Sequence, residues 1–480
     1  MRLRRWLSAA HGAVRPGVLV AGGVAASAVV VVIAATSGSP PTPGDFPNTA
    51  AANVFIAPNG NDAGTNCKRF TPATSVIPTA TTVCDTAAQA YTVAQPGDTV
   101  WLLPGTYSGA WDFRSGTQPT AKTATDATDC NATNQCVYFA PQPGQASNVI
   151  TGGIDFKAGV APEHMYWKGF IRGACPSFSP VNFSNSTVGT NDITADGFIN
   201  DLNGDLAGSD PDCTPYLAGP HTYTRIINGD FEHYCVAGQT VGMPIQSTQS
   251  GQGGEATNHI YVPDHFLIAY NRFHQIDQNC VGSGTHQDCI HHYASTNSTF
   301  RGNIFYNCYD SSILAGGLDE PGYAENNIIE NNWFGPTILG ANNCCLRGDS
   351  TPSTEPFDGW TIRFNSSTST WMNKTGNVLT NVQFIGNVGL GSNVCQPQAT
   401  YRYNISGSSA CDATDLGNQT NTQVKFVNTT ATSALDLRVS AGSIADAFVP
   451  GSQLAGCAGV GIDIFRTARP VPCAAGAYQP

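Results

Sequence analysis

Histidine is the residue type whose placement in this sequence most clearly suggests chemistry. The chain has 480 residues and ten histidines, and eight of these fall between residues 221 and 292. An imidazole titrates near neutral pH and binds metal ions, so this concentration favours a site for proton transfer or metal ligation. The eight are His221, His233, His259, His265, His274, His286, His291 and His292.

The densest group of ligands and bases is the heptapeptide His286-Gln-Asp-Cys-Ile-His-His292. On a strand, Ile290 and His292 would share the inward face and His291 would take the other. Because buried polar groups need partners, we expect His286 and Asp288 at the turn before the strand. Two interpretations stay open: these residues bind a divalent ion or form an Asp–His base, or Asp288 only caps a turn and hydrogen-bonds backbone.

Removal of a proton next to a carboxylate needs a base, a cation that neutralises the carboxylate, and an acid for the leaving oxygen. We expect His291 or His292 to take the proton and Arg301 or a metal ion to hold the carboxylate. A solvated strand arginine is the alternative for Arg301. Hydrolysis would instead need two carboxylates. The chain offers Asp277, Asp288, Asp310, Asp319 and Glu320.

A second constellation, Asp201-Leu-Asn203-Gly-Asp205, presents side-chain oxygens at alternate positions. Oxygen ligands suit calcium, so Asp201, Asn203 and Asp205 are candidates for a calcium-binding surface loop. The loop lacks the glycine and the bidentate glutamate of an EF-hand, and metal-free Asx-turns are the alternative. A divalent cation such as calcium is the one cofactor that we expect.

The N-terminal segment predicts export. Arg2, Arg4, Arg5 and Arg15 precede an uncharged apolar run over residues 18–35. This run suits a signal peptide, with an uncleaved membrane anchor as the alternative. We expect the signal or anchor at residues 1–36, a Pro/Gly/Ser-rich linker at 37–50, and a secreted, extracellular protein that touches a membrane only through an anchor.

Sixteen cysteines in an exported chain predict disulfides, because an oxidising compartment lets thiols pair. Sequence alone cannot fix the connectivity, but near neighbours suggest local bridges. The candidate pairs are Cys67 with Cys84, Cys130 with Cys136, Cys289 with Cys308, Cys395 with Cys411, and Cys457 with Cys473.

The charge balance excludes nucleic acid as a partner. The formal net charge is −12, and cleavage of the leader would remove four of the 22 basic residues and leave −16. A chain this acidic repels phosphate backbones, whereas an acidic polysaccharide is still able to bind where a divalent cation bridges the two. We expect a monomer.

Asparagines that follow short apolar strands repeat along the chain, at Asn271, Asn303, Asn332, Asn365 and Asn387. Their spacings of 32, 29, 33 and 22 residues predict the coils of a solenoid with inserted loops. We expect these asparagines at the corners, where Asn tolerates left-handed backbone angles and stacked side chains hydrogen-bond from coil to coil. A β-sandwich or propeller is the alternative.

Three segments resemble the pectate-lyase-like right-handed parallel β-helix superfamily, in its secreted bacterial form. They are residues 54–62 with 94–107, the His286–Ile290 stretch, and residues 436–443 with 476–478. The resemblance implies an all-β fold, a right-handed parallel β-helix solenoid with inserted loops, an N-terminal cap and a C-terminal closing coil. The single domain would span 51–480, with cap and first coil at 51–110, loop-rich coils at 111–220, central coils at 221–392 and C-terminal coils at 393–480.

The same resemblance implies a polysaccharide-acting protein, and with the histidine cluster it favours a lyase on uronate-containing glycans. A glycoside hydrolase is one alternative, although the Asp-Asp and Arg-x-Lys pattern of the polygalacturonases of this superfamily is absent from this sequence. The other alternative is a non-catalytic cell-surface protein that binds glycan through exposed aromatic residues such as Trp333, Trp360 and Trp371, or serves as a rigid spacer.

Overall fold

A computed structural model describes most of the chain beyond residue 49. It covers residues 50–63, 66–107, 111–112, 136–146, 149–151, 154–155, 163–168, 181–183, 191–197, 199–201, 216–218, 222–232, 245–248, 263–274, 288–292, 295–315, 324–338, 345–348, 357–369, 373–374, 379–392, 395–450, 457, 463–470 and 472–478. The export segment at 1–36 lies outside these residues. Within them, no helix is long and apolar enough to cross a membrane.

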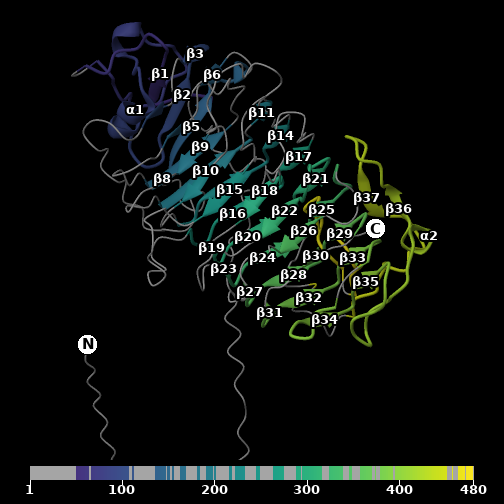
Figure 1. Ribbon diagram of the computed structural model, residues 1–480. Coiled ribbons are helices and arrows are strands. Elements are labelled where there is room, and N and C mark those ends of the chain that lie inside the picture. The colour runs from purple at the N-terminus through teal and green to yellow at the C-terminus, as the bar shows by residue number, and fades with distance from the viewer. Residues whose placement is uncertain are drawn as a thin grey trace, which may run out of the picture. The chain divides into compact units, whose positions relative to one another are not determined.

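The chain from Pro40 to Pro480 forms one compact unit whose strands stack in four parallel sheets (Figure 1). Sheet A contains β1 (Val54–Ile56), β2 (Thr99–Leu102), β5 (Val137–Pro141), β8 (Glu163–Lys168), β10 (Asn191–Asp196), β13 (Arg225–Ile227), β16 (Leu267–Ala269), β20 (Thr299–Arg301), β24 (Ile328–Glu330), β28 (Thr361–Arg363), β32 (Gln383–Ile385) and β34 (Thr400–Arg402). Sheet B contains β11 (Ile199–Asp201), β14 (Asp230–Glu232), β17 (Arg272–His274), β21 (Ile304–Tyr306), β25 (Trp333–Phe334), β29 (Ser366–Ser367), β33 (Val388–Gly389) and β35 (Ile405–Ser406).

The other two sheets complete the coils. Sheet C contains β4 (Trp111–Asp112), β7 (Ile154–Asp155), β9 (Val181–Phe183), β12 (Tyr216–Ala218), β15 (Ile245–Thr248), β18 (Ile290–His292), β22 (Ile313–Ala315), β26 (Leu346–Gly348) and β30 (Asn373–Lys374). Sheet D contains β19 (Ser295–Thr296), β23 (Ala324–Glu325), β27 (Phe357–Asp358) and β31 (Leu379–Thr380). The predicted right-handed parallel β-helix is confirmed, and the β-sandwich and propeller alternatives are wrong.

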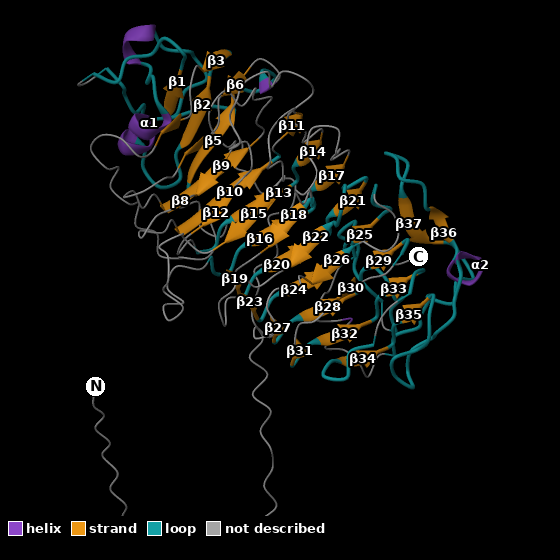
Figure 2. Ribbon diagram, in the orientation of Figure 1, coloured by secondary structure: helices purple, strands orange, loops and turns teal. Residues whose placement is uncertain are grey.

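The coils from β16 to β31 visit the sheets in the order A, B, C and D, and strands of only two to six residues suffice because every coil rests on the next (Figure 2). Alternate residues point inward and stack. Four phenylalanines of sheet B lie ring on ring with centroids 4.9, 5.0 and 5.3 Å apart. They are Phe231, Phe273, Phe305 and Phe334.

The predicted asparagine ladder is confirmed. At Asn332, the side-chain nitrogen Nδ2 donates to Asn365 Oδ1 at 3.0 Å and to the carbonyl of Phe300 at 3.0 Å. Its Oδ1 accepts from both nitrogens of Asn303, at 2.9 and 3.0 Å. The same pattern runs unbroken from Asn271 to Asn404 and ends on Asp415 Oδ1.

The predicted backbone conformation of these asparagines is wrong, because the residue before each one turns the corner instead. Left-handed angles occur at Tyr270 (φ 58°), Gly302 (φ 66°) and Asn331 (φ 58°), directly before the ladder positions. The ladder asparagine is therefore free to point its amide along the stack. A second column of left-handed residues marks the corner that leads into sheet A.

Elements outside the four sheets flank the β-helix at its N-terminal end and along sheet B. At the N-terminal end, the 3-10 turn η1 (Ala80–Thr82) precedes α1 (Ala87–Val93), which contacts β1, and β3 (Gly105–Tyr107) pairs with β6 (Val149–Thr151). Near the C-terminus, α2 (Asn421–Val424) leads into an antiparallel hairpin of β36 (Phe426–Asn428) and β37 (Asp436–Val439). This hairpin packs against sheet B, where Leu437 shares a core with Tyr306 and Trp333.

Residues 463–470 and 472–478 lie along the corner between sheets A and B, from the coil of Asn228 to the coil of Gly386, and we call them the strap. Arg466 donates to Asn228 Oδ1 at 2.7 Å, and Gly476 N donates to the carbonyl of Gly386 at 2.7 Å. These contacts join coils that are far apart in the stack.

Disulfides lie in the N-terminal cap, between two central coils and in the C-terminal part of the chain. Four predicted pairs are confirmed: Cys67–Cys84, Cys289–Cys308, Cys395–Cys411 and Cys457–Cys473. Cys136 is also disulfide-bonded, and its predicted partner Cys130 lies outside the described residues. Paired thiols are what an extracellular protein is expected to carry.

Candidate functional site

Sheet C is the face of the β-helix bordered by the longest connections. The turn from sheet A to sheet B needs only two residues, such as 302–303, whereas the chain enters sheet C through segments as long as 275–289 and leaves it through 249–266. Long connections on a regular scaffold are where binding residues concentrate. The outward side of sheet C is therefore the first place to look for a site.

Strand alternation places His291 and Arg347 on this outward side. Ile290, Ile313 and Leu346 belong to the core, so the residue after each of them points away from it. Register pairs His291 with Leu314 and Leu314 with Arg347. Because neighbouring strands lie about 4.8 Å apart, the two Cα atoms are about 10 Å apart along the stack.

Arg347 has an acidic partner at the entrance to sheet C. Its Nη1 donates to Asp310 Oδ2, and the arginine side chain stays 30% exposed while Asp310 is buried. Asp310 follows β21 and precedes β22, so it stands at the edge of the sheet. The predicted histidine thus shares a face with a half-buried cation that the sequence reasoning missed.

Asp288 lies at the turn before β18, as expected, but it is fully buried there, whereas we expected a turn position that reaches the surface. Its Oδ1 accepts hydrogen bonds from the backbone nitrogen (3.0 Å) and the hydroxyl of Ser311 on the next coil. These are the contacts of the turn-capping interpretation. His286 lies outside the described residues, so its predicted role as a metal ligand or base stays a prediction.

His292 points into the core, as strand alternation predicted. Its ring lies within 5.0–5.8 Å of the rings of Phe266, Phe300 and Trp360, and it is fully buried. Burial lowers the pKa of this imidazole to about 3. A glycan on the surface has no contact with such a group, so we do not assign it the proton transfer that the sequence suggested.

Arg301 belongs to a different face. It lies on the outward side of sheet A in an ion pair with Glu330, whose other oxygen accepts from Arg363 Nε at 2.7 Å. Burial raises the pKa of Glu330, but the charges and hydrogen bonds of Arg363 and Arg301 outweigh it and hold that pKa below its usual value. Arg301 is 6% exposed and committed to this ion pair. It is not placed to serve His291.

The predicted calcium loop is mostly outside the described residues. Asp201 ends β11, whereas Asn203 and Asp205 are not described. The loop therefore stays a prediction. Two tryptophans proposed as exposed glycan contacts, Trp333 and Trp360, are buried, which corrects that alternative; Trp371 is not described.

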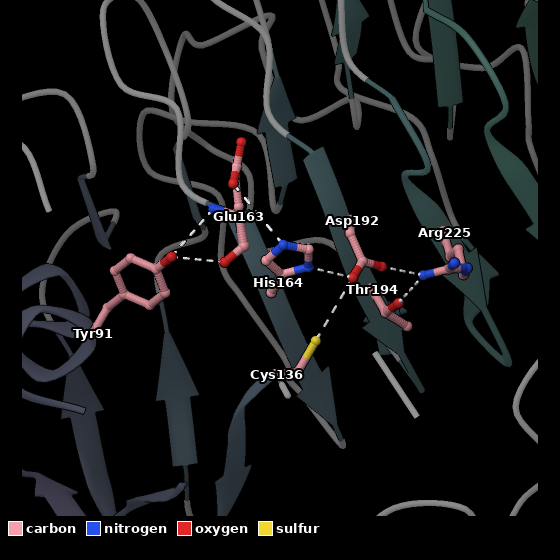
Figure 3. Close-up of polar contacts among 7 residues, drawn as sticks. All are labelled: Tyr91, Cys136, Glu163, His164, Asp192, Thr194 and Arg225. Atoms are coloured by element: carbon pink, nitrogen blue, oxygen red, sulfur yellow. Dashed lines mark hydrogen bonds and ion pairs between the residues drawn. The ribbon is translucent and has the colours of Figure 1, made fainter. Parts of the chain in front are cut away.

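A second polar cluster lies in sheet A around Asp192 (Figure 3). One carboxylate oxygen contacts His164 Nδ1 at 2.8 Å, and the other accepts from Arg225 Nη1 at 2.6 Å. Cys136 Sγ is 3.9 Å from the first oxygen, and Tyr91 donates to the carbonyl of Glu163 at 2.7 Å.

The cluster has the composition of a metal site, since Cys136, His164 and Asp192 bring one ligand atom each to within 4.8 Å of one another. Its chemistry does not fit a cation. Cys136 is in a disulfide and offers no thiolate. Arg225 already supplies the positive charge for Asp192. The cluster is a buried ion pair that joins the early coils.

No protein-family model and no curated protein matches this chain. Among solved structures, it is similar to the pectate lyase Pel9A, with 14% identity over 90% of this chain and 98% of that one and a TM-score of 0.38. It is also similar to XylC in complex with xylose (8% identity, 89% and 98% covered, TM-score 0.43) and to a rhamnogalacturonan lyase (15%, 81% and 96%, 0.40). At these identities and TM-scores the likeness says nothing about activity. The strand pairing itself shows a parallel β-helix.

Proposed function

We propose that this protein is an extracellular polysaccharide-acting enzyme, a lyase on uronate-containing glycans, whose site is the outward side of sheet C. The observation that supports the proposal is the shared face of His291 and Arg347. A base and a carboxylate-binding cation are the two groups that β-elimination most needs. His291 would serve as base and acid, and Arg347 would supply the cation.

Arg347 would hold the uronate carboxylate. A planar guanidinium pairs with a carboxylate in two parallel hydrogen bonds, and it withdraws charge from the carbon next to the carboxylate. In the described structure Arg347 pairs with Asp310, so the glycan would exchange one carboxylate for another. Asp310, freed from the arginine, is then placed at the edge of the site.

His291 would remove the proton. The C–H electron pair then forms the C=C bond, the glycosidic C–O bond breaks, and the leaving oxygen takes the proton that His291 has gained, which returns His291 to its neutral form. His291 is buried in this structure, so the groups over it must move before a glycan reaches it. Catalytic contacts commonly tighten only in the substrate complex.

The test is an ultraviolet assay for unsaturated products on a panel of uronate polysaccharides. The variants H291N and R347Q should each lower kcat/KM about 10²- to 10⁴-fold, as loss of a positioned base or charge does. R272Q is the matched control, because Arg272 is an exposed arginine on the outward side of sheet B. Full activity of H291N, or no unsaturated product from the unmodified protein, contradicts the proposal.

A further inference from the structure

Aromatic residues occupy left-handed corner positions in this β-helix, which is costly for a bulky side chain. At the corner between sheets A and B, arginines of the strap pack over two of these aromatic rings. Arg466 of the strap lies over the Tyr270 ring at 4.1 Å, and Arg469 lies over the Phe364 ring at 4.4 Å. At this corner the face of an aromatic ring is therefore a binding surface for a guanidinium group.

The corner that leads into sheet A has the same geometry but a different set of residues. Its later coils carry the residue types that tolerate left-handed angles, namely Asn297, Asn326, Gly359 and Asn381. Two neighbouring coils carry Tyr223 (φ 53°) and His265 (φ 54°) instead. An aromatic residue replaces asparagine at a backbone position where asparagine is cheaper, and such outliers gather at functional positions.

The half-buried Tyr223 ring and the exposed His265 ring form an aromatic step at the surface, which we call the corner step. Their centroids are 4.9 Å apart with planes inclined by 32°. The His265 side chain is 43% exposed. Among the described residues, no side chain packs over this pair as Arg466 packs over Tyr270.

Asp264 fixes the orientation of the corner step. Its Oδ2 is 2.6 Å from His265 Nδ1, and its Oδ1 accepts from the Thr296 hydroxyl at 2.7 Å and from the Asn297 amide at 2.9 Å. With Nδ1 held by the carboxylate, the other ring nitrogen, Nε2, is left for a partner from outside. The hydrogen bond that His265 donates to the Asp264 carboxylate also raises the pKa of His265, partly opposed by burial.

We propose that the corner step, Tyr223 with His265, is a second glycan-binding subsite that takes one pyranose ring of the polysaccharide. This inference rests on the proposed function for its ligand. The apolar C–H face of a pyranose would pack on the Tyr223 ring, and a sugar hydroxyl would bond His265 Nε2. The exposed Asn297 amide, on the next coil, would bond a second hydroxyl. The corner step stands on the sheet D to sheet A corner, so it binds polymer outside the sheet C face.

Substitution with the residue type of the neighbouring coils makes a precise test. Y223N puts asparagine at a left-handed position, as in Asn297 and Asn381, so its melting temperature should equal or exceed that of the parent. Its dissociation constant for polygalacturonate or alginate, measured by affinity gel electrophoresis in an H291N background that prevents cleavage, should rise at least tenfold. N326G, in the same column three coils away, is the control and should bind as the parent does.

Each outcome has one meaning. Unchanged affinity in Y223N overturns the subsite, and so does a marked fall in its melting temperature, because Tyr223 would then be needed for folding. Absence of any glycan binding by the H291N parent also overturns it. Failure of the lyase proposal looks different: no unsaturated product forms, while the tenfold loss of affinity in Y223N persists.

Discussion

The sharpest prediction concerns acid stability and His292. This imidazole is fully buried among aromatic rings, and Asn327 Nδ2, which only donates, lies 3.4 Å from its Nε2. Burial keeps the ring neutral at neutral pH. Its pKa falls from 6.5 to about 3 because burial penalises the charged form.

The sign follows from proton binding. Between pH 6.5 and about pH 3 the unfolded chain binds a proton that the folded chain does not. Stability is therefore complete above pH 6.5 and falls as the pH drops through this range. Each pH unit is worth about 1.4 kcal/mol, so at pH 4.5 the loss from this one residue is about 2.7 kcal/mol.

The assay is urea unfolding at pH 7 and pH 4.5, followed by tryptophan fluorescence, for the unmodified protein and H292Q. The variant cannot titrate, so the unmodified protein should lose about 2.7 kcal/mol more than H292Q on acidification. Any packing cost of the substitution is present at both pH values and cancels. Equal losses in the two proteins would refute the buried, neutral state of His292. His265 supplies a sign control, because its raised pKa predicts a contribution present below pH 6.5 and lost at higher pH.

Two further predictions concern the fold. N332A should lower the free energy of unfolding by about 3–5 kcal/mol, because it removes four buried hydrogen bonds and leaves their partners unpaired; Q383A, an exposed amide on sheet A, should cost under about 0.5 kcal/mol in the same urea titration. E330Q should lower the free energy of unfolding by about 3–5 kcal/mol, because it leaves Arg301 and Arg363 with a neutral partner. E325Q, on sheet D, is the control. A loss in E330Q no larger than that in E325Q would show that Glu330 is not coupled to the two arginines.

The solenoid and its ladder were predictable from sequence because they arise from a pattern repeated in every coil. The spacing of Asn303, Asn332 and Asn365 reports coil length directly, and their hydrogen bonds link each to the next. The residue that turns the corner was not predictable in this way. Tyrosine, glycine and asparagine all occur there, so the position has no sequence signature.

The candidate site was predictable only in part. Alternation correctly placed His291 and His292 on opposite faces, but it does not show that both become buried. Arg301 lies close to the ladder in sequence, which favoured it as a candidate. It shares its neighbour Tyr270 with strap residues more than 160 positions later, and no local pattern reveals this. Arg347 was missed because connections of variable length hide the coil register. The signal was present, since Arg347 follows the core residue Leu346 as His291 follows Ile290.

The strap also sets an order of events in folding. Most contacts of a solenoid join neighbouring coils, so coils are able to form one after another from any starting point. The strap contacts cannot: Arg466 bonds a residue 238 positions earlier, and Arg469 bonds one 138 positions earlier. They form only when the coils from Asn228 to Gly386 are already stacked. Once made, they resist the peeling of single coils from the end, so the strap prolongs the lifetime of the folded state.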